Sequence, residues 1–456
     1  MRKNNVILII IDTLRSDTFF NSLDHFTNFN RYIGDFNIYR DVISPSPWTL
    51  PSHFSLFSGK YVSEHGMDRT RGEINYYDFL RRVKQTNLSL LADELKSRNF
   101  TTLGYSANPF ISPDTGIDRG FDSFVTVEQR KVPKKLQGKL DEIKKNGSTI
   151  KDIITSVLRY GNMKLLVNLP FIYYQFRREQ EKNGFPKNKG GSYMIDLFQH
   201  TSIRKPFFAF FNLMEMHEPY LLTETLSNPF GGFHDILGIS RIPNSNLKKM
   251  KSVYDSQILV VDQLLANLLD HLKSIGSYND SLIIVTSDHG QAFRENNYYG
   301  HGLFLYDEII KVPLIIKYPS GYSKAKERVD SLIDIYGLIM KYVDEMDLNM
   351  TDSGSKPVFS ESYGTFIDEK DFAHHKEAFN RLIKINSNRK AVFKDGYKLT
   401  INGSTGYIEE FSFEGKKIEI GSHEEMLRSL MEELEIFKGK EKFIIKGEVQ
   451  NIEPEE

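Results

Sequence analysis

The sequence predicts an α/β protein with a mostly parallel central sheet. Three apolar runs carry this prediction, residues 6–11, 205–213 and 281–286, and each leads into polar residues. Unbroken runs rich in Val, Ile, Leu and Phe are typical of parallel strands that are buried on both faces. Residues 88–98 and 247–272 have apolar side chains at helical spacing, which predicts helices between the strands.

The length and composition fit one large domain with additions, or two domains. The chain has 456 residues, of which 40% are hydrophobic and 12% aromatic, enough for a sizeable core. It has no cysteine, which excludes disulfides, thiolate catalysis and cysteine-ligated metals. The formal net charge of −1 gives no global case for a nucleic acid or a membrane as partner, and the sequence has no nucleic-acid motif.

The N-terminal apolar run is short and ends at a carboxylate, Asp12. Residues 1–12 have two basic residues and no small-residue cleavage site, and the run is too short to span a bilayer. We therefore expect a buried strand, no transmembrane segment, and a location in the cytoplasm or at the cytoplasmic face of a membrane. Asp12 lies where open α/β sheets bind ligands, or it caps a helix. Arg15 and Asp17 are expected to form a structural ion pair.

Residues 44–66 are the most informative stretch. Pro45 and Pro47 fix an extended approach, and the small, apolar run 54–59 predicts a helix. Thr49 therefore lies where a loop becomes a helix, close to free backbone N–H groups that favour an anion. A hydroxyl held there can attack a phosphorus or sulfur ester once its proton is removed or masked. The alternative is a plain helix cap.

Histidine and aspartate side chains follow two of the later strands. His217 comes after the run 205–213, and Ser287-Asp288-His289-Gly290 comes directly after 281–286. Adjacent Asp and His at a sharp turn make a good metal-ligand pair. The imidazole favours manganese or zinc over calcium, so we expect one divalent ion, with manganese first and zinc, magnesium or calcium as alternatives. His301, between two glycines, is a candidate to protonate a leaving group or to bind the transferred anion.

Two further strands are predicted, at residues 100–107 and 312–317. Asn108 follows the first of them directly. The second is expected to close the main sheet.

A basic insertion is expected at about residues 130–190. It holds 15 Lys and Arg against 5 Asp and Glu, although the whole chain is near neutrality. A helical cap over the active site, a surface for an anionic polymer and an interfacial helix are all compatible with it, as is a solvated helical excursion. A basic cap would raise the local concentration of an anionic substrate.

The C-terminal region changes to an alternating pattern from residue 390. Asp395-Gly396 and Asn402-Gly403 supply turns, so we predict antiparallel hairpins followed by a helix at 423–437. The chain therefore divides into a catalytic domain and a small sheet-and-helix subdomain, residues 1–380 and 381–456.

The motifs resemble those of the sulfatase branch of the alkaline phosphatase superfamily. Its signature reads nucleophile-x-Pro-Ser-Arg, a small and apolar helix, Thr-Gly, and then His-Gly. This chain has Thr49-Leu50-Pro51-Ser52-His53, then Ser58-Gly59, then His65-Gly66. The resemblance continues in order through most of the chain, at Asp12, His217, Asp288-His289-Gly290 and His301-Gly302.

The resemblance implies a fold and a set of site residues. The implied fold is an alkaline-phosphatase-like three-layer α/β/α sandwich. The implied metal ligands are Asp12, Thr49, Asp288 and His289. The implied catalytic groups are Thr49, His301 and His217. The implied substrate contacts are His53, Asn108, His217 and His65.

The chain departs from the family pattern at three places that bear on chemistry. Thr49 replaces the cysteine from which most sulfatases make formylglycine, so the hydrate-elimination route is closed. Thr13 replaces a second ligand aspartate. Residues 106–109 lack the Gly-Lys-x-His pair that contacts sulfate in arylsulfatases, and Asn108 offers an amide instead.

These residues favour a metal-dependent hydrolase or transferase. We expect it to act on a phosphate mono- or diester through a covalent intermediate at Thr49. A sulfuric ester hydrolase is the first alternative, and a non-catalytic binding protein with the same fold is the second. The expected partner is an anionic ester, such as a glycan, a polymer or a lipid headgroup; the oligomeric state stays open.

Overall fold

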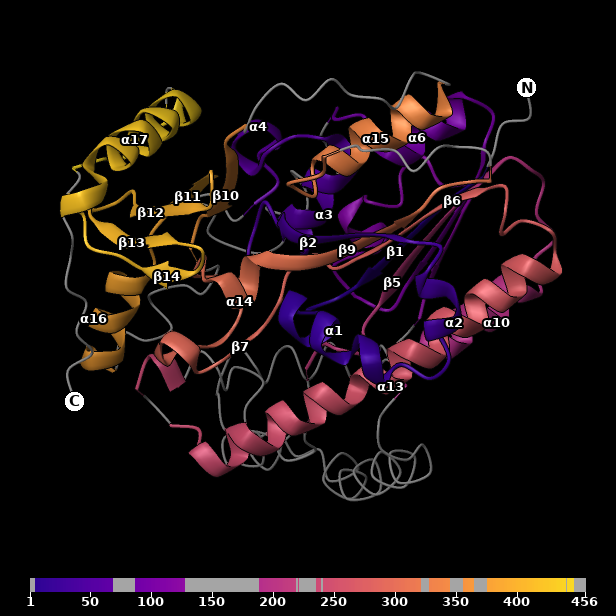
Figure 1. Ribbon diagram of the computed structural model, residues 1–456, viewed down its shortest axis with the longest axis horizontal. Helices are drawn as coiled ribbons and strands as arrows, with labels where there is room; N and C mark the ends of the chain where they lie inside the picture. Colours follow the sequence, from indigo (N-terminus) through magenta and orange to yellow (C-terminus); the bar gives the residue numbers. More distant parts are fainter. Residues whose placement is uncertain are drawn as a thin grey trace, which may run out of the picture.

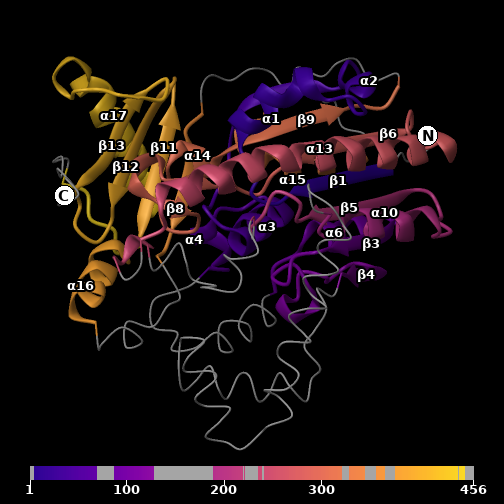
Figure 2. The ribbon, with the colours of Figure 1, turned by 90° about the horizontal axis from the view of Figure 1, so that it is seen from below.

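The computed structural model describes residues 5–68, 87–127, 188–218, 220, 235–238, 241–320, 328–344, 356–364, 375–439 and 441–446. Figure 1 shows a large sheet between layers of helices with a smaller sheet beside it, and Figure 2 shows the same arrangement from below. The predictions for the basic insertion lie outside the described residues, except at its end, 188–190. Among the described helices, none combines the length and apolar character needed to cross a bilayer.

The central sheet has seven strands in the order β2-β9-β6-β1-β5-β3-β4. β1 lies in the middle, parallel to both β5 and β6, and all seven of its residues are buried. Within this sheet only β9 runs against its neighbours, which confirms the predicted mostly parallel sheet. The strands are β1 (Asn5–Ile11), β2 (Asn37–Ile43), β3 (Thr101–Ser106), β4 (Ser123–Thr126), β5 (Phe207–Leu213), β6 (Ser281–Thr286) and β9 (Lys311–Lys317).

The prediction that residues 312–317 close the main sheet is wrong. They form β9, but β9 lies inside the sheet, between β6 and the edge strand β2. The sequence analysis missed β2 because its residues, NIYRDVI, alternate between partly buried and exposed positions before the last two become buried. An edge strand keeps polar and charged side chains and lacks the unbroken apolar run of a central strand.

Helices cover both faces of the sheet, so the predicted three layers are present (Figure 1). On one face Val6, Leu8 and Ile10 pack with apolar side chains of α3 (Thr49–Ser58), α6 (Leu91–Ser97) and α15 (Asp334–Val343). On the other face the alternate residues of β1 pack with helices of a second core. These are α1 (Ser16–Ser22), α2 (Asn30–Ile33), α10 (Gly191–Gln199) and α13 (Asn244–Ser274).

A second, smaller sheet is antiparallel, and α17 (Glu424–Lys438) packs on it through Leu427, Leu430 and Leu434. β10 is its first strand, so the predicted boundary at residue 380 falls between β10 and β11. The sheet strands are β10 (Val358–Ser362), β11 (Arg389–Lys394), β12 (Tyr397–Asn402), β13 (Ile408–Phe413) and β14 (Lys416–Lys417). The neighbouring helices are α16 (Lys376–Ile385) and α17 (Glu424–Lys438).

Short elements complete the described structure. The two-stranded hairpin of β7 (Ala292–Phe293) and β8 (Tyr299–Gly300) stands apart from both larger sheets. The short helices are η1 (Leu23–His25), α4 (Val62–His65), η2 (Pro113–Thr115), η3 (Glu295–Asn297), α14 (Asp307–Ile310) and η5 (Gly421–His423).

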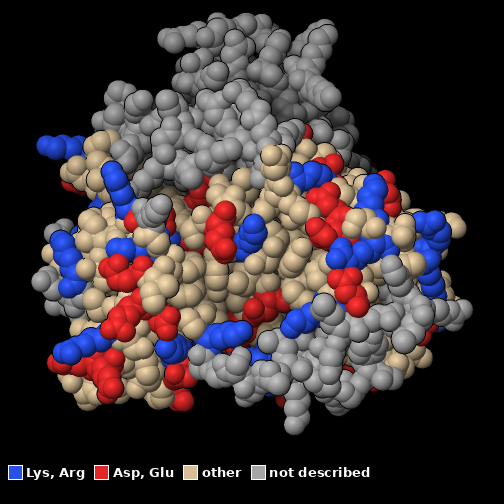
Figure 3. All heavy atoms as spheres, turned by 90° about the horizontal axis from the view of Figure 1, so that it is seen from above, with Lys and Arg blue, Asp and Glu red and all other residues tan. Residues whose placement is uncertain are grey.

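Charged side chains of both signs are mixed over the described surface seen in Figure 3. Some form ion pairs, as Arg98 at the end of α6 does with Glu94 of the same helix and with Asp344 at the end of α15. The mixture agrees with the near-zero net charge.

A buried ion-pair cluster joins the small sheet to the main domain. Lys398 of β12 is 3% exposed, and its Nζ donates to Asp307 Oδ1 of α14 at 2.8 Å and to Glu410 Oε2 at 2.7 Å. Burial alone would raise the pKa of Asp307, but Lys398 and Lys311 lower it to about 2. The Lys398–Asp307 ion pair therefore stabilises the contact between β12 of the small sheet and α14.

Replacing Asp307 by asparagine is expected to lower the free energy of unfolding by about 1–3 kcal/mol, because buried Lys398 loses a charged partner. The folded pKa of Asp307 lies below its ordinary value of 3.8, so this contribution is present above pH 4 and is lost as the pH falls toward 2. Chemical denaturation at pH 7 and pH 3 measures both effects. Glu424→Gln, in the exposed pair with Arg428, is the control and should change stability by less than about 0.5 kcal/mol. Equal losses in the two variants would contradict the prediction.

Candidate active site

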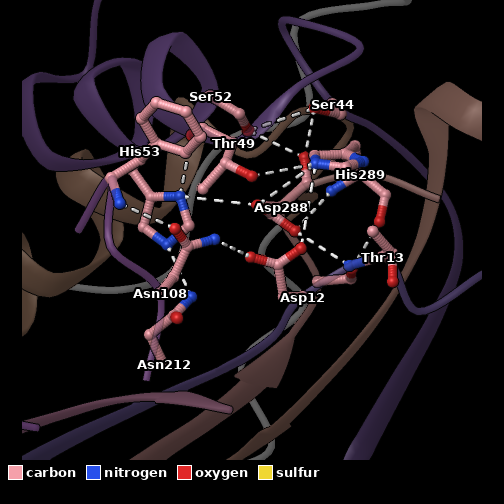
Figure 4. Close-up of polar contacts among 12 residues, drawn as sticks. Asp12, Thr13, Ser44, Thr49, Ser52, His53, Asn108, Asn212, Asp288 and His289 are labelled. Carbon is pink, nitrogen blue, oxygen red and sulfur yellow. Dashed lines mark hydrogen bonds and ion pairs between the residues drawn. The ribbon is translucent and has the colours of Figure 1, made fainter. Parts of the chain in front are cut away.

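The candidate site lies where the carboxyl ends of the parallel strands meet. The parallel sheet fixes this arrangement, because strands that run the same way end at the same edge. Asp12 follows β1, Asn108 follows β3, and Asp288 with His289 follows β6. The segment after β2 leads to Thr49, and Figure 4 shows the side chains from these segments converging.

Asp12 is fully buried and held by one of its two oxygens. Oδ2 accepts a hydrogen bond of 2.6 Å from Asn108 Nδ2. Oδ1 has no hydrogen-bond partner among the described residues. Asn108 is held in turn, because its Oδ1 accepts from the Phe110 N–H at 2.8 Å. Asn108 therefore orients Asp12 with one oxygen turned to the site.

Asp288 is oriented in the same way. Its Oδ1 accepts from the backbone N–H groups of Thr13 and His289, at 3.3 and 2.9 Å, and Oδ2 has no hydrogen-bond partner in the described part of the chain. The carbonyl of Asp288 accepts from Ser44 and Ser52 at 2.5 and 2.8 Å. These two hydroxyls tie the Thr49 segment to the end of β6.

His289 presents a lone pair to Thr49. Its Nδ1 donates to the Gly290 carbonyl at 2.9 Å, so the unprotonated nitrogen of the neutral ring is Nε2. Nε2 lies 3.2 Å from Thr49 Oγ1. Burial lowers the pKa of His289 to about 4, which keeps the ring neutral near pH 7. A neutral imidazole is the form that ligates a metal.

Asp12, Asp288 and His289 together fit a divalent metal ion. One ligand atom from each lies within 4.8 Å of the others, and the two unpartnered carboxylate oxygens are among the buried atoms of this cluster. Burial raises the pKa of Asp12 to about 6, with Asp288 adding to the shift, and burial raises the pKa of Asp288 to about 7. Two buried carboxylates side by side are costly without a cation between them. Two carboxylate oxygens and an imidazole are a donor set that can hold a divalent ion.

Thr49 occupies the predicted place at the start of a helix. It is the first residue of α3, it is 3% exposed, and Trp48 before it is extended. Pro51, in the first turn, has no N–H, so the first-turn N–H groups of Thr49 and Leu50 are the donors available to an anion. The Thr49 hydroxyl thus lies beside His289 Nε2 and near the N–H groups at the start of α3.

His53 is fully buried beside the cluster. Its Nδ1 donates to the Thr49 carbonyl at 2.8 Å, and its Nε2 accepts from Asn212 Nδ2 at 3.2 Å. Burial lowers the pKa of His53 to about 3, so it is a neutral support in this structure. The sequence analysis missed Asn212; an asparagine within the apolar strand FFAFFNL was the available signal.

His217 and His301 lie beside each other at the site. Their ring centroids are 5.3 Å apart, and the ring of His301 is 4.5 Å from that of His289. His65 is placed differently. Its Nε2 donates to Ser55 Oγ at 2.8 Å and its Nδ1 accepts from the Met67 N–H at 2.9 Å, so both nitrogens join α3 to the segment after α4.

Comparison with known proteins identifies the family of this chain. The profile of the Sulfatase family matches residues 4–345. The chain belongs to the sulfatase family. Enzymes of this family are metal-dependent, which agrees with the cluster of Asp12, Asp288 and His289.

Two curated relatives and one solved structure illustrate the match. The chain is 26% identical over 167 residues to an endo-4-O-sulfatase of Bacteroides thetaiotaomicron, covering 34% of this chain and 32% of the relative. It is 24% identical over 226 residues to an arylsulfatase of Clostridium perfringens, covering 44% and 46%. The match thus spans less than half the length of either relative. A phosphonate monoester hydrolase from Silicibacter pomeroyi has the same alkaline-phosphatase-like fold, with TM-score 0.61 and 16% identity over 95% of this chain and 94% of that chain.

Thr13 is an unusual feature of this sulfatase-family site. It has φ of 60°, a left-handed conformation that costs a β-branched residue about 1–3 kcal/mol. Tyr254 holds the strained turn, because its hydroxyl donates to the Thr13 carbonyl at 2.8 Å and accepts from the Arg15 N–H at 2.9 Å. The strain presents the Thr13 N–H to Asp288. From the sequence, only the absence of a ligand carboxylate at Thr13 is apparent; its backbone strain and the contact with Tyr254 are not.

Replacing Asn108 by alanine is expected to weaken Mn²⁺ binding about 10–100-fold, because Asp12 loses the group that orients it. A titration that follows the fluorescence of Trp48, the single tryptophan and the neighbour of Thr49, measures the affinity. Asn267→Ala, at a partly exposed position of α13, is the matched control and should leave the affinity unchanged. Equal affinity in both variants would show that Asn108 does not orient Asp12.

Proposed function

We propose that this protein is a metal-dependent phosphoester hydrolase whose nucleophile is Thr49. The position of Thr49 Oγ1 carries the proposal: it lies 3.2 Å from His289 Nε2, at the N-terminus of α3. The hydroxyl is therefore next to the proposed metal ligands and to helix-terminal N–H groups. The proposed substrate is a phosphate mono- or diester. A transferase would use the same threonyl intermediate and differ only in its final acceptor.

The side chains at the site divide the work of ester cleavage. A divalent ion held by Asp12, Asp288 and His289 would supply positive charge that lowers the pKa of the Thr49 hydroxyl and offsets charge on the ester oxygens. Thr49 loses its proton to solvent and attacks phosphorus, forming an O–P bond as the bond to the alcohol oxygen breaks. His301 donates a proton to that oxygen. His217 is proposed to contact the non-bridging oxygens; its ring centroid lies 5.3 Å from that of His301.

The second half of the reaction regenerates the threonine. Water attacks phosphorus of the threonyl ester, and the bond to Thr49 Oγ breaks. His301 accepts a proton from the water, which restores its starting state. An acceptor alcohol in place of the water gives transfer instead of hydrolysis.

The choice of phosphate over sulfate rests on Thr49 itself. Threonine cannot become formylglycine, so a sulfated Thr49 would have to be cleaved by attack at sulfur. Sulfate hydrolysis is the second candidate, and membership of the sulfatase family favours it. The similar proteins include an arylsulfatase, named for a sulfur ester, and a phosphonate monoester hydrolase, named for a phosphorus ester.

Metal analysis combined with three chromogenic substrates tests the proposal. Wild type and Thr49→Ala are assayed with p-nitrophenyl phosphate, bis-p-nitrophenyl phosphate and p-nitrophenyl sulfate, with manganese, zinc, magnesium or calcium added. Thr49-dependent cleavage of either phosphate ester supports the proposal, and manganese is the expected ion. Preferred cleavage of the sulfate would assign the protein as a sulfatase. Absence of both metal and turnover would favour a binding protein.

The alcohol part of the substrate and the location are also proposals. The basic composition of residues 130–190 supports an anionic glycan, polymer or lipid headgroup. The proposed location is the cytoplasm. Cell fractionation tests the location.

A further inference from the structure

The β7–β8 hairpin brings a buried amide to His301. Its register pairs Ala292 with Gly300 and Phe293 with Tyr299, so Gln291 lies opposite His301 at the next position. Gln291 is fully buried, and its Oε1 is 2.7 Å from His301 Nδ1. This contact is the only hydrogen bond that the described residues provide to the Gln291 side chain, because its Nε2 has no partner among them.

The backbone of Gln291 is held from two sides. Its N–H donates to the Glu308 carbonyl at 3.1 Å, and its carbonyl accepts from Arg15 Nη1 at 3.1 Å. Arg15 is fixed by Asp17 and by Glu295 of η3. Gly290 is needed at this approach, since a Cβ there would lie 2.2 Å from the Glu308 carbonyl oxygen. The amide therefore has a rigid base, which a group that orients another residue requires.

The amide oxygen selects one form of the His301 ring. An amide oxygen only accepts, so Nδ1 must carry a proton. In the neutral ring the lone pair is then on Nε2, and the second proton of the imidazolium is also on Nε2. The proton available to a leaving group is thus confined to one nitrogen in one orientation.

Stability alone does not account for a glutamine at this position. A buried amide whose donor has no partner among the described residues is destabilising, whereas an apolar side chain of the same shape would pack without that cost. The side chain that avoids the cost would leave His301 Nδ1 without its acceptor. The burial of the amide is therefore explained by what it does for His301.

We propose that Gln291 is a positioning residue that holds His301 so that Nε2 delivers the proton to the leaving alcohol. The inference rests on the proposed function, since it needs His301 to protonate a leaving group there. Gln291 itself does not touch the substrate. Its effect should therefore depend on how strongly the leaving group needs a proton.

The test compares two leaving groups in the full-length, metal-loaded protein. p-Nitrophenolate leaves without protonation, whereas ethoxide does not. The p-nitrophenyl and ethyl esters of phosphate and of sulfate are assayed with wild type, Gln291→Met and Gln291→Glu. Methionine keeps the length without the acceptor, and glutamate keeps an acceptor at the same place. General acid catalysis contributes about 10²–10⁴-fold.

We expect Gln291→Met to lower kcat/KM, which reports the steps up to departure of the alcohol, by about 10²-fold or more for the ethyl ester and by less than about tenfold for the p-nitrophenyl ester. Gln291→Glu should keep the wild-type ratio of the two esters. Adding His301→Gln to Gln291→Met should cost little more on the ethyl ester, because both changes remove the same proton transfer. Equal losses on the two esters, or a change in KM alone, would overturn the assignment.

The two hypotheses fail differently. If wild type cleaves only the sulfate esters, the proposed phosphoester substrate is wrong, but the leaving-group ratio on the sulfates still decides the role of Gln291. If wild type cleaves no ester at all, the proposed hydrolase fails and the role of Gln291 fails with it.

Selective ¹⁵N-histidine labelling adds a readout that needs no turnover. The His301 ring should show the Nδ1–H tautomer in wild type and lose it in Gln291→Met; the same tautomer in both would overturn the assignment.

Discussion

Replacing Thr49 by valine is expected to lower kcat/KM by about 10⁴–10⁶-fold, the scale on which loss of a catalytic nucleophile is felt. Valine has the shape of threonine, so buried α3 keeps its packing while the attacking oxygen is lost. Activity against the best of the three p-nitrophenyl esters measures the loss. Metal content measured on the same samples separates a chemical effect from loss of the ion.

Two controls belong to this experiment. Thr49→Ser keeps a hydroxyl and should retain far more activity than the valine variant. Ser55→Ala lies on the same helix, where Ser55 Oγ accepts from His65, and should affect stability more than catalysis. If Thr49→Val kept wild-type turnover, a covalent threonyl intermediate would be excluded.

Replacing Asp288 by asparagine is expected to abolish stoichiometric Mn²⁺ binding and to lower kcat/KM by about 10³-fold or more. A catalytic metal is worth several kcal/mol, and each 1.36 kcal/mol is a factor of ten. The same change should stabilise the metal-free protein, because it removes one of two buried like charges. The effect on stability therefore reverses between the metal-free and the metal-loaded protein.

The metal-free wild type should also have a characteristic pH dependence. Burial raises the pKa of Asp288 from 3.8 to about 7 and that of Asp12 to about 6. A carboxyl with a raised folded pKa stabilises fully below its unfolded pKa, and that contribution is lost as the pH rises through the folded pKa. The free energy of unfolding should therefore fall between about pH 4 and pH 7 in chelator, and Mn²⁺ should restore it at pH 7.

Chemical denaturation with chelator or with Mn²⁺, at several pH values, measures this dependence. Asp288→Asn should show a smaller fall with pH and no restoration by the metal. Asp307→Asn, which lies in the cluster between the two sheets, should respond to Mn²⁺ as the wild type does. Identical profiles for wild type and Asp288→Asn would contradict a metal site at Asp288.

Much of the fold could be predicted from the sequence because central strands have a strong signal. β1, β5 and β6 are buried on both faces, so each is an unbroken apolar run whose end is easy to find. β2 was missed, and β9 was put at the edge, since pairing order across a sheet depends on contacts between distant segments. A single sequence carries no direct record of those contacts.

The same distinction applies to the site. Four site residues could be identified from the sequence because each lies close after a strand or begins a helix, in the order of the family motif. They are Asp12, Thr49, Asp288 and His289. The supports were not visible in this way. Asn212 of β5 is hydrogen-bonded to His53 of α3, which is far from it in the sequence. Gln291 is hydrogen-bonded to His301 across the β7–β8 hairpin.

Local sequence patterns are enough to identify the central strands and the polar groups at their ends, because burial and the alternation of strands and helices both leave a local hydrophobic pattern. The tertiary structure decided how those groups are oriented. Asn108 takes one oxygen of Asp12, and the N–H groups of Thr13 and His289 take one oxygen of Asp288, which leaves the other oxygens for the metal site. Such choices depend on distances and angles between segments far apart in the chain, since a hydrogen bond forms only within a narrow geometry.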